Sequence, residues 1–226
     1  MQTFGVLYIV STPIGNLEDI TLRALRILKE VGLIAAEDTR RTRKLLTHYE
    51  IHTPITSYYT YNKFVRGMEL IEELKAGKNI ALVSDSGTPG ISDPGIDLIK
   101  LAISHSIKVV PVPGPSAVIS ALVGAGFSTH EFVFVGFLSK KNSHRKKELM
   151  GLKDEKKTII IYESPYRVKD TMQNILEILG DRNVVICREL TKLYEEFIRG
   201  KASEVVESLK TKTLRGECTI VIKNYE

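Results

Sequence analysis

Cysteine is scarce in this 226-residue sequence, which has only Cys187 and Cys218, each inside an apolar run. That setting favours buried thiols in strands. Two cysteines do not make a zinc site. Because the sequence also shows no N-terminal secretory signal, the low cysteine content predicts a cytoplasmic protein in a reducing compartment.

Long hydrophobic runs are also missing. The first apolar run, from Val6 to Val10, is followed directly by a turn. No stretch approaches the roughly 20 apolar residues that span a bilayer, so we expect no membrane-spanning helix. The contents of 43% hydrophobic and 26% charged residues are ordinary for a soluble globular protein. A formal charge of +5 is compatible with a polyanionic partner but does not demand one.

The chain shows no internal repeat and no low-complexity tract. In its first half, short β-branched runs alternate with helical patterns, which is typical of a parallel sheet with helical crossovers. Asn16 is a plausible N-cap for a helix that ends at Gly32, and Gly77 ends another helix. The pattern predicts strands at 5–11, 33–37, 55–60, 80–85 and 108–114, with helices at 17–32, 68–77 and 95–106.

The second half repeats the alternation less regularly, so we expect a mixed sheet there. The stiff turn at 111–115 favours a domain change, which gives α/β domains at 1–115 and 116–226. The polar segment 139–157 is typical of a solvated loop and helix. Strands are predicted at 132–138, 158–164, 183–190, 196–200 and 218–223, with helices at 167–180 and 202–210.

Turn-forming residues are concentrated in the stretch LVSDSGTPGISDPG, residues 82–95. Its glycines let the backbone approach a ligand closely, and its prolines make the turns rigid. Asp85, at a strand end, can accept hydrogen bonds, whereas Asp93 is better suited to cap the next helix with Pro94 at the first helical position. The stretch lacks the terminal Gly-Lys-Ser/Thr of a phosphate-binding P-loop. It also does not match the G-x-G-x-x-G pattern of dinucleotide-binding loops.

Two further loops carry open alternatives. In GPSA, Ser116 and the backbone N–H groups either face an anionic ligand group or simply cap a helix. In AEDTRRTRKLL, Glu37 and Asp38 are followed by Arg40, Arg41, Arg43 and Lys44. These acids either begin a salt-bridged helix or form a reacting centre beside an anion-binding edge.

A second basic cluster and an aromatic run are candidates for RNA contacts. The tyrosines 58, 59 and 61, with Asn62, can stack on a base, although at least one tyrosine is expected in the core. The basic cluster either contacts phosphates or is only a solvated face. It contains Lys140, Lys141, His144, Arg145, Lys146 and Lys147.

The motifs LYIVSTPIGNLEDITLRAL, AAEDTR, LVSDSGTPGISDPG, VPVPGPSA, YESPYR and CRELTK occur here in a characteristic order. From about Leu7 to about Val221 the chain resembles a family of 16S ribosomal RNA cytidine 2'-O-methyltransferases within the tetrapyrrole methylase superfamily. The resemblance implies two α/β domains with S-adenosylmethionine in the cleft between them, usually in a homodimer. It also implies methyl transfer to a ribose 2'-oxygen of the small ribosomal subunit.

The matched loops of the family imply the cofactor contacts, and the residue types indicate the rest. We expect no metal, because the acids are not spaced like a known ligand set and the displacement needs no Lewis acid. For the acceptor side we predict Glu37 and Asp38, with Lys192 as a second candidate and Arg40 orienting a phosphate. RNA contacts are predicted for Arg40, Arg41, Arg43, Asn62, Lys140, Lys141, Arg145 and Lys146. The resemblance implies cofactor contacts by Pro13, Asp85, Gly87, Ile91, Ser116, Ala117, Tyr162 and Thr191.

Three departures from the family pattern matter. Residues 59–63 are YTYNK where relatives show H-x-H-N-E, so no histidine base is expected there. Ser139 replaces the proline of GFLP. Many relatives also carry a further C-terminal segment, so RNA affinity is expected to rest on the basic clusters or on the dimer. Two alternatives stay open, a methyltransferase of a tetrapyrrole precursor and a non-catalytic RNA-binding assembly factor.

Overall fold

The computed structural model describes residues 4–223 and divides into two units, the first ending at Ser116 and the second beginning at Ala117. We call them unit 1 and unit 2 and describe each by itself. The division lies beside the predicted domain boundary after residue 115, and that assignment of domains stays a prediction. In the described range, no helix is long and apolar enough to cross a membrane.

Unit 1 is built on a parallel sheet of five strands in the order β3-β2-β4-β1-β5. All neighbouring strands pair in parallel, which confirms the predicted sheet type. Each predicted strand is present, although all five are shorter than predicted. The strands are β1 (Val6–Val10), β2 (Leu33–Ala36), β3 (Ile55–Ser57), β4 (Ile80–Val83) and β5 (Lys108–Val112).

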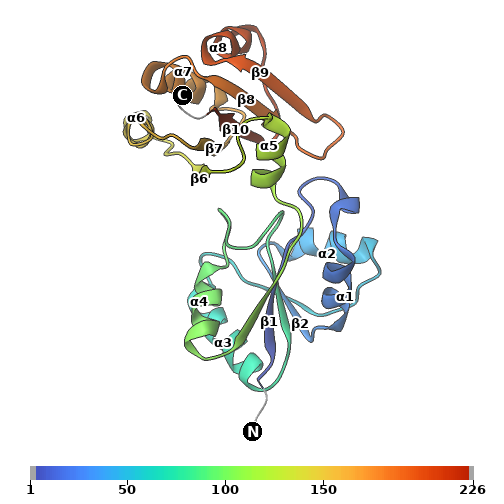
Figure 1. Ribbon diagram of the computed structural model, residues 1–226. Helices are drawn as coiled ribbons and strands as arrows, with labels where there is room; N and C mark the ends of the chain where they lie inside the picture. The colour runs from blue at the N-terminus through green and yellow to red at the C-terminus, as the bar shows by residue number, and fades with distance from the viewer. Residues whose placement is uncertain (1–3, 224–226) are drawn as a thin grey trace. The chain divides into compact units, whose positions relative to one another are not determined.

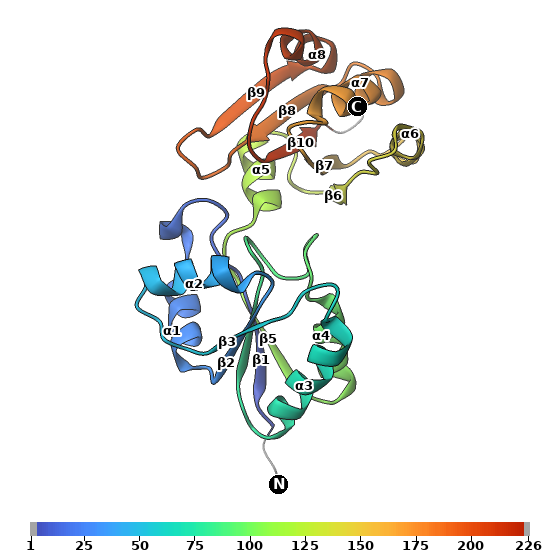
Figure 2. The ribbon, with the colours of Figure 1, turned by 180° about the vertical axis from the view of Figure 1, so that it is seen from behind.

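Helices cover both faces of this sheet (Figures 1 and 2). In β2, Leu33 and Ala35 belong to the apolar cluster that includes residues of α3 and α4, while Ile34 and Ala36 belong to the cluster with residues of α1 and α2. Because both faces are buried, the inner strands β1, β2 and β4 are apolar throughout rather than alternating. The helices are α1 (Leu22–Glu30), α2 (Thr39–His48), α3 (Lys63–Lys75) and α4 (Ile96–Ser104).

The predicted helix 17–32 is two elements. Asn16 caps only a 3-10 turn, η1 (Leu17–Asp19), by accepting the N–H of Glu18. The α-helix begins at Leu22, where the Thr21 hydroxyl accepts the N–H of Ala24 at 3.1 Å. The helix ends at Glu30. Gly32 does not adopt a positive φ, and an added Cβ there would lie 2.8 Å from the Lys78 side chain, so close packing explains this glycine.

Three other predicted boundaries were wrong. The strand at 55–60 ends at Ser57, yet the Tyr58 ring is buried, which confirms a core tyrosine. Helix α4 begins at Ile96 with Gly95 at its N-cap, so Pro94 is not its first residue. Gly77, with a φ of 90°, follows the C-cap of α3 and confirms the predicted helix end. That helix begins at Lys63, earlier than predicted.

Unit 2 contains a mixed sheet, as predicted, and its five strands lie in the order β6-β7-β10-β8-β9. Strands β6 and β7 are parallel, and the other pairs are antiparallel. Its strands are β6 (Phe132–Phe137), β7 (Thr158–Glu163), β8 (Asn183–Arg188), β9 (Glu196–Lys201) and β10 (Cys218–Ile222), and its helices are α5 (Ala117–Ala125), α6 (Asn142–Met150), α7 (Val168–Leu179) and α8 (Ala202–Thr211).

The core of unit 2 lies between its sheet and helices α6, α7 and α8, and α5 packs against β8 and β10 (Figure 1). Cys187 and Cys218 are free and buried, as expected. Burial raises the pKa of each thiol to about 12. Both thiols therefore stay protonated and unreactive at neutral pH.

Candidate functional site

The loops at the carboxyl edge of the unit 1 sheet form a connected frame. Thr12, after β1, and Gly87, after β4, exchange backbone hydrogen bonds of 2.9 and 3.0 Å. Beside them, the hydroxyls of Ser11 and Thr88 are hydrogen-bonded at 2.8 Å. An added Cβ at Gly114, after β5, would lie 2.9 Å from the Cβ of Ser11. Loops from three strands are thus fixed against one another.

The glycines of the loop after β4 are required by its path. Gly87, Gly90 and Gly95 have φ values of 75°, 87° and 143°, which L side chains rarely adopt. At Gly95 an added Cβ would also lie 3.2 Å from the backbone nitrogen of Gly90. Ser92 adopts a φ of 62° without being glycine, at a cost on the order of 1–2 kcal/mol. This loop is therefore held in one tightly folded shape.

Three carboxylates meet where β2 and β4 end. Ala36 pairs with Val83 at the end of the two strands, which brings the following residues together. Asp85 Oδ1 accepts the backbone N–H of Asp38 at 3.1 Å. In return, Glu37 Oε2 accepts the N–H of Asp85 at 3.4 Å. The sequence predicted these acids at strand ends, and the structure brings all three into one cluster.

Two arginines of α2 neutralise two of the three carboxylates. Asp38 is the N-cap of α2, accepts the Arg40 N–H at 2.8 Å, and pairs with the Arg40 guanidinium through both oxygens at 3.2 and 3.0 Å. Arg41 Nη1 lies 3.2 Å from Asp85 Oδ2. Among residues 4–223, Glu37 receives only the hydrogen bond from Asp85. Glu37 thus has an oxygen available to a ligand.

These contacts move the pKa values of the neighbouring acids in opposite directions. Hydrogen bonds from the Arg40 side chain and backbone lower the pKa of Asp38 to about 2. Burial, followed by the nearby charge of Asp85, raises the pKa of Glu37. Glu37 is therefore the better proton acceptor of the two, and Asp38 acts first as a helix cap. The structure thus confirms that Asp38 begins a salt-bridged helix. A catalytic role for Asp38 stays a prediction.

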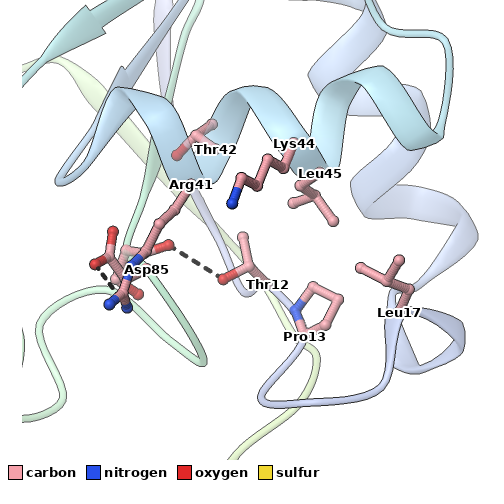
Figure 3. A pocket seen from close by; sticks show the side chains of 9 residues that line it. Thr12, Pro13, Leu17, Arg41, Thr42, Lys44, Leu45 and Asp85 are labelled. Carbon is pink, nitrogen blue, oxygen red and sulfur yellow. Dashed lines mark hydrogen bonds and ion pairs between the residues drawn. The ribbon is translucent and has the colours of Figure 1, made fainter.

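A pocket of about 190 Å³ lies beside this cluster (Figure 3). Arg41 turns to Asp85 on one side, and the Lys44 side chain extends from α2 above Thr12 and Pro13. The Thr12 hydroxyl donates to the Ser84 carbonyl at 3.2 Å. Sites for whole small molecules are usually about 300–1,000 Å³. This pocket therefore has room for a part of a ligand, such as a sugar or a phosphate group.

The other predicted cofactor residues of unit 1 lie on its loops. Ile91 is half exposed in the loop after β4. Ser116 ends unit 1, and Ala117 begins α5 in unit 2. The two interpretations of the GPSA segment, a ligand-facing turn or a plain helix start, both stay predictions.

In unit 2, the predicted cofactor residue Tyr162 lies near the end of β7. Its ring packs against Phe134 and Phe137, with centroid distances of 4.8 and 5.5 Å. The next residue, Glu163, is buried and pairs with Arg167 at 2.5 Å. Arg167 also donates to the Leu138 carbonyl at 3.1 Å. The Glu163–Arg167 pair thus ties the loops after β6 and β7 together.

Sequence reasoning missed this pair. The available signal was the YESPYR motif, which places an acid at a strand end four residues before an arginine. Glu163 also accepts the Thr171 hydroxyl at 2.6 Å and the Ser164 N–H at 2.7 Å. A buried carboxylate with this many donors positions its neighbours rather than reacting.

The predicted residues Thr191 and Lys192 lie in a strained turn after β8. Glu189 and Thr191 have φ values of 51° and 66°. Lys192 Nζ lies 2.9 Å from both Glu189 and Glu217. Burial opposes its charge, but these hydrogen bonds outweigh that effect and raise the pKa of Lys192. Lys192 is thus held as an ammonium ion, which disfavours a role as a base and leaves a role as a cation.

Two members of the second basic cluster have partners within the chain. Arg145 is only 3% exposed, and its guanidinium donates to Asn142 at 3.0 Å, beside the Asn174 amide. The expectation that Arg145 lies on a solvated face is wrong, because it fills the interior between α6 and α7. Lys146 is paired with Glu177 at 2.7 Å. Lys140 and Lys141 are exposed, as expected.

Asn62 has a structural function. Its side-chain oxygen accepts the N–H of Tyr59 at 2.8 Å, and its amide donates to the Ser57 carbonyl at 3.2 Å. Tyr61 is almost fully exposed, and its ring contacts that of Tyr59. Asn62 therefore holds the turn that presents the two exposed tyrosines. Among residues 4–223, no group of three or more metal-ligating side chains is arranged to hold a metal ion.

Comparison with known proteins gives a consistent result. Residues 6–206 match the family model Tetrapyrrole (Corrin/Porphyrin) Methylases. A Halalkalibacterium halodurans protein named ribosomal RNA small subunit methyltransferase I is 52% identical over 98% of this chain and 77% of its own length. A protein of the same name from Thermotoga maritima is 49% identical over 98% of this chain and 100% of its own length. Relatives thus differ in length beyond the matched region.

Solved structures share the fold at low identity. A cobalt precorrin-4 methyltransferase of cobalamin biosynthesis has a TM-score of 0.73 at 18% identity, over 96% of this chain and 94% of that one. A diphthine synthase has a TM-score of 0.74 at 12% identity, over 97% of this chain and 90% of that one. These likenesses support the two α/β units and carry no information about the acceptor.

Proposed function

This chain belongs to the tetrapyrrole methylase family, and on that premise we propose that it methylates small-subunit ribosomal RNA with S-adenosylmethionine. The finer proposal is transfer to the ribose 2'-hydroxyl of a cytidine in 16S rRNA. One observation supports ribosomal RNA as the class of substrate. Curated relatives about 50% identical over nearly the whole chain are named ribosomal RNA small subunit methyltransferase I.

The residues of unit 1 fit a sulfonium cofactor. When bound, S-adenosylmethionine supplies a methyl group on a positively charged sulfur. Carboxylates and carbonyl oxygens favour such a charge, and Asp85 stands beside a rigid glycine-rich loop whose backbone is open to close approach. We propose cofactor contacts from Pro13, Asp85, Gly87, Ile91 and Ser116 of unit 1 and from Ala117, Tyr162 and Thr191 of unit 2.

On the acceptor side, Glu37 is proposed to take the proton. The bound cofactor would supply the methyl group to the ribose oxygen, and Glu37 would be placed to take the proton that the hydroxyl gives up. Glu37 has a free oxygen and raised basicity, whereas Asp38 is committed to Arg40. Arg41 is proposed to fix Asp85, and Lys192 to contribute positive charge. Much of the rate is then expected to come from positioning.

The partners follow as proposals. Small-subunit RNA or the assembled subunit is the proposed substrate, the proposed assembly is a homodimer, and the proposed compartment is the cytoplasm. The basic residues Lys140 and Lys141 of unit 2 and Arg40 and Arg43 of unit 1 are exposed and suited to phosphate contacts.

The test is methyl transfer from labelled S-adenosylmethionine to two acceptors, offered separately. One is small ribosomal subunits from a strain that lacks the modification, and the other is a uroporphyrinogen-type precursor. Label in the subunits alone supports the proposal. Label in the precursor alone would overturn the substrate class, and cofactor binding without transfer to either would point to an assembly factor.

A further inference from the structure

Helix α2 has an unusual charge distribution. Its ten residues, Thr39–His48, include four arginines and lysines and no acid. Three of the four cations lie in its N-terminal half, where the helix dipole makes positive charge unfavourable. Asp38, at the N-cap, offsets part of this charge by pairing with Arg40. The sequence of α2 is therefore not arranged for helix stability alone.

The cations divide between two directions. Arg41 turns to Asp85 and is used inside the site (Figure 3). Arg40, Arg43, Lys44 and Thr47 follow the i, i+3, i+4, i+7 spacing of one helix face. Together with His48 they line a shallow surface depression of about 470 Å³. We call these five residues the α2 basic face.

The charge of this face is only partly neutralised. Arg40 is paired with Asp38, but in the described part of the chain neither Arg43 nor Lys44 forms an ion pair. Lys44 also lines the smaller pocket that contains Thr12 and Asp85. One lysine therefore joins the strand-end cluster to the outer surface of the helix.

We propose that the α2 basic face binds consecutive phosphates of the RNA strand that carries the target nucleotide. Lys44 contacts the phosphate nearest the pocket, and Arg43 contacts the next one outward. This proposal rests on the proposed function for its substrate class. Phosphate contacts fix the position of a nucleic acid but do not read its bases. The face therefore sets the register of the strand beside Glu37, and sequence is read elsewhere.

The test measures the salt dependence of RNA binding by the full chain. The probe is a mixed-sequence single-stranded RNA, and the variants are R43Q/K44Q and K29Q/K100Q. The second pair removes the same formal charge from exposed positions on α1 and α4 that form no ion pair among residues 4–223. Each lost phosphate contact lowers the slope of log K against log salt by about 0.7 for a single strand.

We expect R43Q/K44Q to lower that slope by about 1.4, while K29Q/K100Q leaves the slope near the wild-type value. If both variants lowered the salt slope equally, the net charge of the protein would explain RNA binding, and the proposal would be overturned. No effect of R43Q/K44Q on free RNA, with an effect on assembled subunits, would assign the face to a ribosomal protein. If the wild-type protein bound RNA but transferred no methyl group, the proposed function would be rejected, whereas the proposal for the α2 basic face would stand.

Discussion

Two basic segments of the molecule, residues 37–48 around α2 and residues 139–147 around α6, use similar residues differently. In the first, Arg41 is drawn to Asp85, while Arg43 and Lys44 form no ion pair in the described range. In the second, Arg145 is buried and Lys146 is paired with Glu177. A run of cations therefore indicates a binding surface only where its side chains are neither buried nor paired with acids of the same chain.

The reason for the difference lies in what each helix packs against. Helix α2 covers the sheet mainly through Thr42 and Leu46, which leaves its basic positions on the outside. Helix α6 packs against α7, and this contact takes Arg145 into the interior together with Leu149. The buried guanidinium donates to the side-chain oxygen of Asn142 rather than to a carboxylate. The second segment is therefore mainly structural.

The largest expected effect concerns the acidic start of the first segment. Glu37→Gln should lower turnover by about 10²–10⁴-fold, because the variant cannot take the acceptor proton. Asp38→Asn should lower turnover less than Glu37→Gln, yet more than it lowers cofactor affinity. Single-turnover methyl transfer and calorimetric binding of S-adenosylmethionine separate these effects. Unchanged turnover in Glu37→Gln would show that the proton leaves by another route.

The next effect separates the two segments by stability. Arg145→Ala should lower the free energy of unfolding by about 1–3 kcal/mol, because the buried hydrogen bond to Asn142 and the packing of the side chain are lost. Arg43→Ala, on the exposed face, should stay within about 0.5 kcal/mol of wild type. Urea denaturation of both variants measures this difference. Equal stabilities would contradict the structural role of Arg145.

A smaller effect is expected from the exposed lysines of the second segment. K140Q/K141Q should lower the salt slope of RNA binding by less than about 0.7, which corresponds to less than one phosphate contact. R43Q/K44Q, measured in parallel, is the reference. If K140Q/K141Q gave the larger change, the main RNA-binding surface would belong to unit 2, and the comparison drawn above would be reversed.

The smallest effect is a dependence of stability on pH. The pKa of Asp38 is lowered to about 2, so its ion pair with Arg40 contributes fully above the unfolded value of about 3.9 and is lost as pH falls through the folded value. Asp38→Asn should lack this part of the acid dependence. Acid titration of unfolding for both proteins measures it, and identical curves would show that the pair does not contribute to stability.

The sequence predicted the sheet types and most elements of the fold. Continuous apolar strands bounded by turn residues revealed the parallel sheet of unit 1. The boundaries at Leu22, Ser57 and Ile96 were missed, because Thr21 competes with Asn16 as a cap and because the glycine-rich loop extends to Gly95. Local propensity does not decide between two adjacent caps or locate the end of a strand.

At the candidate site, the sequence placed Glu37, Asp38 and Asp85 at strand ends but did not assign their partners. The pairing of Arg41 with Asp85 depends on β2 lying next to β4, which the order of strands along the chain does not reveal. The burial of Arg145 likewise depends on tertiary packing. Residue type and spacing indicate chemistry, whereas the neighbour that neutralises a charge is set by the fold.

The most direct test of the central claim is nucleoside analysis of small-subunit RNA after incubation with labelled S-adenosylmethionine and the wild-type protein. The subunits must come from a strain that lacks the modification. The account predicts label in 2'-O-methylcytidine at one position. Label in a base-methylated nucleoside, or none in RNA despite clear cofactor binding, would contradict it.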